Sequence, residues 1–581
     1  PLDELVPIEN AAMDDRTVIE WDKDDIDAMG MLKVDCLGLG MLTCVRKALE
    51  LLGCAEPRPG APPTVYPSYT RVVRRPADAA TYEMVSRADT IGVFQIESRA
   101  QMSMLPRLRP REFYDLVIEV AIVRPGPIQG GMVHPYLRRR SGEEPVEYPS
   151  DAVEEVLGRT LGVPIFQEQA MRLAIVAAGF TADEADGLRK AMGAWKKRGN
   201  AMVEYGRRLI AGMQANGYPT EFAERCFEQL KGFSEYGFPE SHAASFALIV
   251  YVSAWLKRHR PAAFAAALIN SQPMGFYAPA QIVRDAEAHG VEVRPIDVNH
   301  SAWDCTLEGS PDEADALAPL PEGQPPGRWG KGRPAVRLGM RLVKGLREEE
   351  ATAIAEAVSH RGPMADVEAL WRASGVRVEA LRRLARADAF GSMGLDRQRA
   401  LWQIRPLRDT PMPLFEQAGA IAANGSDHAS NGLDALPAVA AGRRVLDDYE
   451  TTGLSLKAHP ISFVRAGLRG RGVIETADLR RERDCPQGRR VQVAGIVLCR
   501  QRPSTASGVV FITLEDETGI ANLVIWRDTY ERYRKAARLS TALLAEGTVE
   551  RQGEVVHVHA RRLESIDALL PSLTSISRDF H

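Results

Sequence analysis

The feature that most limits how this chain can fold is a change in the spacing of its apolar residues toward the C-terminal end. Within 77–278 apolar residues recur at intervals of three and four, which is typical of helices. From 491 onward, short runs rich in β-branched residues are bounded by glycine and acidic turns, which is typical of strands. The chain has 581 residues, of which 45% are hydrophobic, and this is more than one core uses. A multidomain α+β protein is therefore expected, with a large helical domain before a β-rich one.

Apolar spacing is most regular in six stretches. Each is expected to form a helix: 41–52, 153–157, 169–178, 185–192, 220–231 and 243–259. A short apolar run around Asp35 precedes the first stretch, so a strand, a turn and a helix are expected within 28–52. The composition in proline, glycine and acidic residues marks 309–336 as a flexible insertion. A segment rich in alanine, glycine, asparagine and serine, 417–441, is expected to be disordered.

The C-terminal region predicts a small β-barrel. Strands are expected at 491–498, 509–516, 520–526, 542–549 and 554–563, with one helix near 530–537. This order fits a Greek-key barrel of the OB type. Such barrels commonly bind single strands of nucleic acid. A barrel that docks a protein or only packs against its neighbours is the alternative that the sequence leaves open.

Several classes of protein are excluded by composition. No apolar run is long enough to cross a bilayer, and the N-terminus lacks a secretory leader, so a cytoplasmic protein without a membrane partner is expected. The cysteines are odd in number and never spaced as C-x-x-C, which argues against a disulfide framework and a zinc ribbon. They are Cys36, Cys44, Cys54, Cys226, Cys305, Cys485 and Cys499.

The net charge does not discriminate between functions. It is −4, although binding to phosphates depends on lysine and arginine. The basic residues are clustered at 138–140, 195–198 and 256–260, and acids gather in what we interpret as a polar turn at 22–27. A basic cluster of this kind suits either a DNA-facing groove or a solvated face.

Six short motifs in one order resemble those of the bacterial C-family DNA polymerases, the DNA polymerase III alpha subunits. They are 33–39, which resembles the palm motif, followed by 92–98, 124–127, 166–169, 188–193 and 236–244, which resemble the fingers motifs. One such match can arise by chance, but six in order cannot. Four segments are similar to the error-prone branch of this family: 238–242, 270–277, 511–519 and 577–581.

The resemblance covers nearly the whole chain and implies its domain order. The expected parts are the end of a polymerase palm at 1–55, helical fingers at 56–280, a tandem helix-hairpin-helix region at 281–405 that contains the insertion, a linker and partner-binding region at 406–484, the OB barrel at 485–565 and a tail at 566–581. The first residue is Pro1, and the resemblance implies that upstream sequence is missing and that the C-terminus is complete.

Asp35 is the candidate catalytic residue. From its place in an apolar strand it either binds metal or caps the next helix. The resemblance implies the metal role, because Asp35 falls where the family has its third palm carboxylate. The implied cofactor is a pair of Mg²⁺ ions, which prefer carboxylate oxygens. The other two carboxylates are expected upstream of this chain, because Asp22, Asp24 and Asp25 lie too near Asp35 to replace them.

Four residues are candidates for binding the nucleotide. Lys33 would project from the same strand face as Asp35. The resemblance places Arg189 and Lys190 at a pair of cations that bind phosphates, and it places His242 near the sugar. For His242 a packed core histidine is the alternative.

Four further residues are candidates for binding DNA. Lys196 and Lys197 either contact the template or belong to a solvated helix face. Gly345 and Gly375 each lead into a helical stretch, which predicts two short helical hairpins. Backbone N–H groups of such hairpins can hold phosphates without reading sequence, and ordinary helix packing is the alternative.

The expected function is templated DNA synthesis in damage-tolerant, translesion repair. The implied partners are primer–template DNA, deoxynucleoside triphosphates and accessory mutagenesis proteins, including an inactive Y-family-like polymerase. Contact with the sliding clamp is expected to be indirect, because 411–415 resembles a clamp-binding peptide only weakly. Two alternatives stay open: a replicative alpha subunit, and a non-catalytic fragment that binds DNA or assembles a complex.

Overall fold

The structure is a computed structural model. It describes residues 2–11, 17–21, 23–30, 37–54, 72, 78–123, 132–193, 199–232, 239–309, 329–331, 334–409, 439–502, 508–552, 555–570 and 578–580. The chain divides into two units, Pro1–Gly40 and Met41–His581.

The first unit has few regular elements. They are a 3-10 turn at Leu2–Glu4, the antiparallel pair β1 (Ile8–Asn10) and β2 (Thr17–Ile19), and α1 (Lys23–Ala28). The sequence predicted a polar turn at 22–27, and this was wrong, because the acidic residues from 24 to 27 lie in α1. The strand expected around Asp35 lies outside the described residues.

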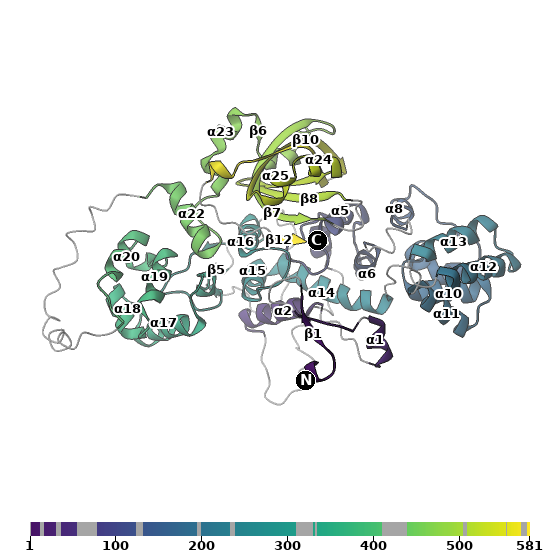
Figure 1. The fold of residues 1–581 in the computed structure, drawn as a ribbon, viewed down its shortest axis with the longest axis horizontal. Helices are drawn as coiled ribbons and strands as arrows, with labels where there is room; N and C mark the ends of the chain where they lie inside the picture. The colour runs from purple at the N-terminus through teal and green to yellow at the C-terminus, as the bar shows by residue number, and fades with distance from the viewer. Residues whose placement is uncertain are drawn as a thin grey trace. The chain divides into compact units, whose positions relative to one another are not determined.

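Helices dominate the second unit as far as residue 288 (Figure 1). They are α2 (Leu39–Leu51), which begins at the boundary of the units, α4 (Ala79–Ser86), α5 (Arg99–Leu108), α6 (Phe113–Ile122), α8 (Val133–Ser141), α9 (Asp151–Leu157), α10 (Gln167–Ala178), α11 (Ala182–Gly193), α12 (Gly199–Ala215), α13 (Thr220–Gly232), α14 (Glu240–His259), α15 (Pro261–Asn270) and α16 (Pro279–Ala288). All six helices that the apolar spacing predicted are present.

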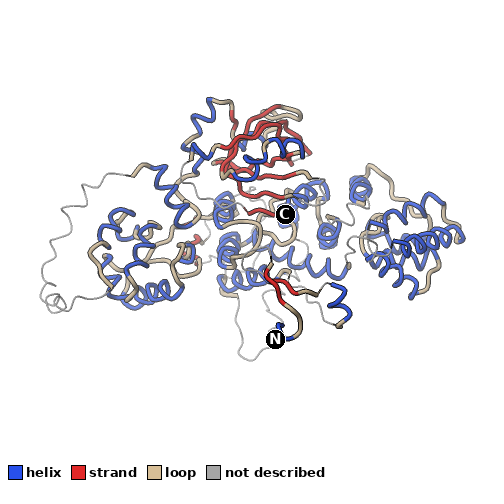
Figure 2. Tube along the Cα trace, in the orientation of Figure 1, coloured by secondary structure: helices blue, strands red, loops and turns tan. Residues whose placement is uncertain are grey.

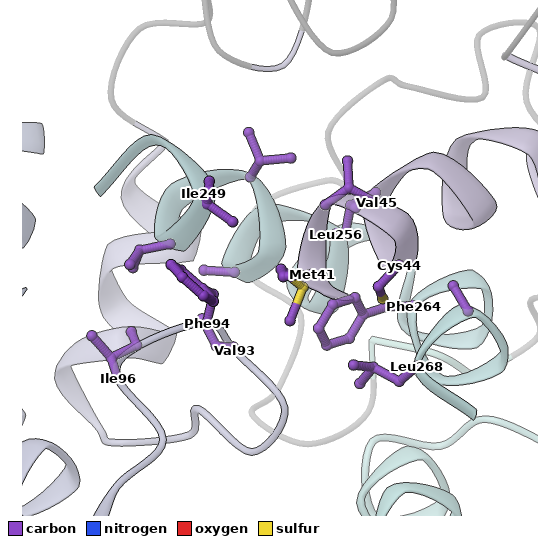
Figure 3. Packing of buried hydrophobic residues seen from close by; sticks show 14 of the residues in the cluster. Met41, Cys44, Val45, Val93, Phe94, Ile96, Ile249, Leu256, Phe264 and Leu268 are labelled. Carbon is purple, nitrogen blue, oxygen red and sulfur yellow. The ribbon is translucent and has the colours of Figure 1, made fainter. Parts of the chain in front are cut away.

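α14 and α15 lie at the centre of the helical core. α15 is rich in alanine and buried at every position, and α14 is buried from Ile249 onward. Helices that are apolar on every side are expected at such a position. Figure 3 shows Met41 and Cys44 of α2 close to Phe264 of α15, within the cluster that also contains Phe94. Within the described residues, no helix has both the length and the apolar character needed to cross a bilayer.

A three-stranded sheet follows that the sequence did not predict. Its strands are β3 (Val293–Arg294), β4 (Thr306–Glu308) and β5 (Ala335–Arg337), in the order β3-β5-β4. The stretch marked as flexible, 309–336, therefore ends inside β5. It also contains Trp329, which is buried and stacked on His289 with ring centroids 4.7 Å apart.

A group of helices and 3-10 turns connects this sheet to the barrel. They are the 3-10 turn η3 (Met340–Leu342), α17 (Glu348–Arg361), α18 (Val367–Ser374), α19 (Val378–Arg386), η4 (Gly391–Met393), α20 (Arg397–Ile404), α22 (Ala441–Thr452), η6 (Pro460–Phe463), α23 (Arg465–Gly470), the strand β6 (Val473–Ile474) and η7 (Thr476–Arg480). The expected disorder at 417–441 lies outside the described residues as far as 438.

The C-terminal barrel has the strand order that the sequence predicted, and its strands are red in Figure 2. The single helix expected near 530–537 is two short helices. Its elements are β7 (Arg490–Gln501), β8 (Val510–Asp516), β9 (Gly519–Ile525), α24 (Arg527–Arg532), α25 (Arg534–Leu539), β10 (Ala542–Gln552) and β11 (Val555–Ser565). The strand order β10-β11-β9-β8-β7 closes on itself because β7 also pairs with β10. β9 and β11 are parallel, and the other neighbours in the barrel are antiparallel. This is an OB barrel with its own apolar core. A short C-terminal strand, β12 (Arg578–Phe580), adds to β7.

Candidate nucleotide- and DNA-binding sites

The first turn of α14 is where separate sequence motifs meet. The backbone N–H of Glu240 donates to Oε2 of Glu168, from the motif at 166–169, at 3.0 Å. The carboxylate of Glu240 accepts a hydrogen bond from the hydroxyl of Tyr114 at 2.8 Å. A carboxylate at a helix N-terminus satisfies an otherwise unpaired N–H and interacts favourably with the helix dipole. Glu168 therefore stabilises the helix that carries His242.

His242 lies in the same turn and joins a row of aromatic rings. Its ring centroid is 4.2 Å from that of Phe246, which in turn meets Phe94 edge-on at 5.2 Å and 83°. Phe94 belongs to the motif at 92–98, and its backbone N–H donates to Oγ of Ser253 on α14 at 3.3 Å. The motif at 92–98 thus packs against the helix that carries His242. Contact between His242 and a sugar stays a prediction.

Arg189 and Lys190 lie on α11 and share one acid. Asp186 accepts from Arg189 Nη2 at 2.8 Å and from Lys190 Nζ at 2.9 Å. Hydrogen bonds from Lys190 and then from Arg189 lower the pKa of Asp186. All three side chains are exposed, so an incoming phosphate can compete for both cations.

Other predicted site residues lie outside the described residues. These are the candidate ligand Asp35 with Lys33, the lysines Lys196 and Lys197, and the weak clamp-peptide resemblance at 411–415. Their roles stay predictions.

The structure contains one group of described side chains with the donor atoms of a metal site. Asp89, Asp285 and His289 each offer a ligand atom, and these atoms lie within 4.8 Å of one another. The ammonium of Lys257, however, is 2.9 Å from Oδ1 of Asp89 and 2.9 Å from Oδ2 of Asp285. A bound lysine already supplies the positive charge, so these residues do not fit a divalent cation.

The same group is a buried ion network. Burial opposes ionisation of Asp89, but Lys257 and His289 outweigh it and hold the pKa of Asp89 well below its usual range. Burial raises the pKa of Asp285. His289 Nε2 lies 2.7 Å from Oδ2 of Asp89, and although burial acts in the opposite direction, this contact raises the pKa of His289.

The basic cluster at 256–260 is therefore neither a DNA-facing groove nor a solvated face, and both expectations were wrong for it. Lys257 is paired as described, and His259 Nε2 lies 2.7 Å from Oδ2 of Asp78. The guanidinium of Arg258 lies 4.6 Å from the ring centroid of the buried Trp329. The cluster at 138–140 is also paired, with Glu144 and Asp115. The partner acids are distant in sequence from the 256–260 cluster, so no local pattern identified them.

Sequence reasoning also missed a buried acid. Glu119 on α6 is fully buried, and its carboxyl oxygens have no hydrogen-bond partner within the described residues. Burial raises the pKa of this carboxyl well above its usual range, because the charged form would lose its hydration. In the sequence, the burial of Glu119 is indicated by its place as the single acid in the apolar run at 116–123.

The two glycine turns adopt similar backbone conformations. Gly345 has φ +78° and Gly375 has φ +64°, a region that side chains other than glycine rarely adopt. Each is followed by a buried apolar residue, Leu346 or Val376, and then by a helix. The second turn joins α18 to α19 as predicted. The first differs from the prediction, because the arm before Gly345 is only the 3-10 turn η3.

Glu350 links the two turns. Arg347 precedes α17 and Arg377 precedes α19, and their Nη2 atoms lie 2.9 and 3.3 Å from Oε1 of Glu350. Burial would raise the pKa of this carboxylate, but the arginines outweigh burial and lower it. The beginnings of both helices are thereby held near one buried acid, while the two arginines remain largely exposed.

Comparison with protein families agrees with this architecture. Residues 1–38 match the model described as "Bacterial DNA polymerase III alpha NTPase domain", and residues 41–217 match "Bacterial DNA polymerase III alpha subunit finger domain". Residues 290–400 match a helix-hairpin-helix motif, and residues 491–566 match an OB-fold nucleic acid binding domain.

Similar curated proteins are named error-prone DNA polymerase. The chain is 52% identical to one from Sinorhizobium medicae over 100% of its own length and 51% of that protein. It is 51% identical to one from Pseudomonas aeruginosa over 100% of its own length and 52% of that protein. The chain thus spans about half the length of the curated relatives it matches. A solved asparaginyl-tRNA synthetase from Pyrococcus horikoshii is 26% identical over 16% of this chain and 21% of that one, and its TM-score of 0.13 supports no argument.

The motifs in order, the paired glycine turns and the OB barrel agree with these matches along the whole chain. The chain therefore belongs to the family of bacterial DNA polymerase III alpha subunits, in the error-prone branch.

Proposed function

We propose that this chain is part of a DNA polymerase that extends a primer on a DNA template during error-prone, damage-tolerant repair. The observation that carries the proposal is the 51–52% identity, along the entire chain, to proteins named error-prone DNA polymerase. The helical hairpins and the OB barrel support it, because both kinds of domain commonly bind nucleic acid.

The proposed chemistry is nucleotidyl transfer with two divalent metal ions, Mg²⁺ in our proposal. When bound, the ions activate the primer 3′-oxygen and stabilise the leaving pyrophosphate. Asp35 would hold metal together with further carboxylates, and the group around Asp89 does not supply them because it already binds Lys257.

The proposed roles of the other candidates follow from charge and position. Arg189 and Lys190, with Lys33, bind the triphosphate of the incoming deoxynucleotide, because cations offset the negative charge of its oxygens. His242 positions the sugar from the first turn of α14, where its ring packs on Phe246.

Three parts of the chain bind the sugar–phosphate backbone of DNA. They are the helical hairpins at Gly345 and Gly375, the lysines Lys196 and Lys197, and the OB barrel. We further infer a cytoplasmic location, accessory mutagenesis proteins as partners, and contact with the sliding clamp only through them.

The test is primer extension in the full-length protein that carries the rest of the palm. Asp35→Asn keeps the shape of the side chain but removes the charge that holds a metal. Extension should fall by about 100-fold or more, because metal coordination contributes several kcal/mol to transition-state stabilisation. Affinity for primer–template should stay within about 2-fold, because phosphates are bound elsewhere.

Asp25→Asn in α1 is the matched control, because it removes a nearby acid that is not proposed as a ligand. This variant should retain full extension. The 581-residue chain alone should not extend a primer. Robust extension by that chain, or equal loss of DNA affinity and extension in Asp35→Asn, would contradict the proposed role of Asp35. Absence of templated extension by the unaltered full-length protein would overturn the proposed function.

A further inference from the structure

One outer face of the barrel is covered by the rest of the chain. Ile512 and Leu514 of β8 point into the barrel core, so Thr513 and Glu515 point outward, yet both are buried. Thr513 accepts a hydrogen bond from Arg99 on α5, and Glu515 lies 2.9 Å from Nη1 of Arg284 on α16. This strand belongs to the face with which OB barrels usually bind oligonucleotides. The outer side of β8 is therefore not open to a ligand.

Trp526, directly after β9, is exposed. Its side chain is 54% exposed, although tryptophan is among the costliest residues to leave in water. Its indole N–H donates to Nδ1 of His559 at 3.1 Å, and the two rings stack with centroids 5.9 Å apart. His559 Nε2 is in turn paired with Glu550 on β10.

These contacts orient the indole. An indole N–H can only donate, so Nδ1 of His559 accepts this hydrogen bond. The hydrogen of the imidazole is then on Nε2, which donates a hydrogen bond to the carboxylate of Glu550. A chain of hydrogen bonds thus holds an aromatic ring at the surface, as a stacking platform requires.

The two helices after Trp526 are rich in cations. Five basic side chains against two acids give 527–539 a net charge of +3, while the whole chain has −4. The five are exposed and form no ion pair within the described residues: Arg527, Arg532, Arg534, Lys535 and Arg538. By contrast, Arg397 on α20 and Arg465 on α23 are largely buried and paired with acids. Cations without such partners are available for phosphates.

We propose that this face of the barrel, Trp526 with the five cations of α24 and α25, binds single-stranded DNA. An unpaired base stacks on the indole of Trp526, and the backbone phosphates on either side lie along the basic helices. Aromatic rings beside cations are the combination that holds single strands without sequence preference. The proposal rests on the proposed function, since it names the surface that holds the unpaired template strand.

The test compares two exposed apolar residues of the same segment in the full 581-residue chain. Trp526→Ala removes the platform, whereas Leu539→Ala, at a residue that is 67% exposed, removes exposed apolar surface alone. Binding to a fluorescent oligo-dT should weaken about 5- to 150-fold in Trp526→Ala, which is the effect of removing the stacking with one base. It should change less than about 2-fold in Leu539→Ala, and duplex affinity should change little in either variant.

A charge variant tests the phosphate contacts separately. Arg534→Glu with Lys535→Glu should reduce the salt dependence of oligo-dT binding, because fewer counterions are released. Unchanged oligo-dT affinity in Trp526→Ala would overturn the proposal and leave the surface to a protein partner, as would failure of the unaltered chain to bind oligo-dT. Primer extension that depends on Asp35 would leave the proposed function standing in either case.

Discussion

At the scale of single residues, Lys257 connects segments of the buried core through two ion pairs. Its ammonium lies between two carboxylates in a fully buried position on α14, the helix that also carries His242. It thereby joins α14 to α16 and to the turn before the motif at 92–98. Residues of a buried pair stabilise a fold only while both partners are present, because a lone buried charge loses its hydration without compensation.

Lys257→Met should therefore destabilise the protein strongly. The variant keeps the length of the side chain but leaves Asp89 and Asp285 facing each other, at a cost of about 3–5 kcal/mol. Urea unfolding should show a lower midpoint. Lys535→Met on the exposed face of α25 is the control, with an expected change within about 0.5 kcal/mol. Adding Asp89→Asn and Asp285→Asn to Lys257→Met should recover part of the stability, and no recovery would show that the charges are not the cause.

The pH dependence of stability should reveal His289. Its folded pKa is raised, so its contribution is fully present below the unfolded pKa of about 6.5 and is lost as pH rises through the folded pKa. The charged groups that face it are Asp89, Asp285 and Lys257. The difference in unfolding free energy between the unaltered chain and His289→Gln should be larger at pH 6 than at pH 9. In an Asp89→Asn background this difference should lose most of its pH dependence.

At the scale of elements, alanine substitutions at two glycine turns can distinguish an effect on protein stability from an effect on DNA binding. Gly375 ends α18, and Gly453 ends α22, with φ of +64° and +78°. A methyl group added at either position meets no atom within 4 Å. The backbone cost of alanine should therefore be similar at both, about 1 kcal/mol. Only the turn at Gly375 belongs to a predicted DNA-binding hairpin.

Gly375→Ala should weaken duplex binding, whereas Gly453→Ala should not. The added methyl group projects into open space at the hairpin, where a phosphate would approach backbone N–H groups. Duplex affinity measured by anisotropy, with unfolding midpoints for both variants, distinguishes the two effects. Equal affinities despite equal decreases in stability would assign the hairpin to packing alone.

At the scale of the whole molecule, a net charge of −4 means that DNA must be bound by local groups of cations. Such binding releases condensed counterions, so the logarithm of affinity should fall linearly with the logarithm of salt, by about 0.9 per duplex phosphate neutralised and about 0.7 per single-strand phosphate.

Lys196→Gln with Lys197→Gln should lower the duplex slope by about 0.9 for each phosphate that these lysines neutralise in the unaltered chain. Arg138→Gln is the control and should leave the slope unchanged, because Arg138 is not one of the residues that we propose to bind DNA. Titrations at several salt concentrations measure both slopes, and a flat salt response would rule out binding through the backbone.

The sequence alone determined six helices, the strands of the OB barrel and the family. These follow from local information, because apolar periodicity and short motifs are written in neighbouring residues. It also indicated Gly345 and Gly375 correctly as turns. It missed the sheet of β3, β4 and β5, because strands of two or three residues are too short to show a period.

Only the tertiary structure decided which charges face solvent. The cluster at 256–260 reads in sequence like a DNA-binding patch, but its partners Asp78, Asp89 and Asp285 come from distant segments that meet only in the folded core. The same is true of the barrel, where strand alternation cannot show that Thr513 and Glu515 are covered by other helices. Local pattern specifies elements, whereas burial and pairing depend on which elements pack together.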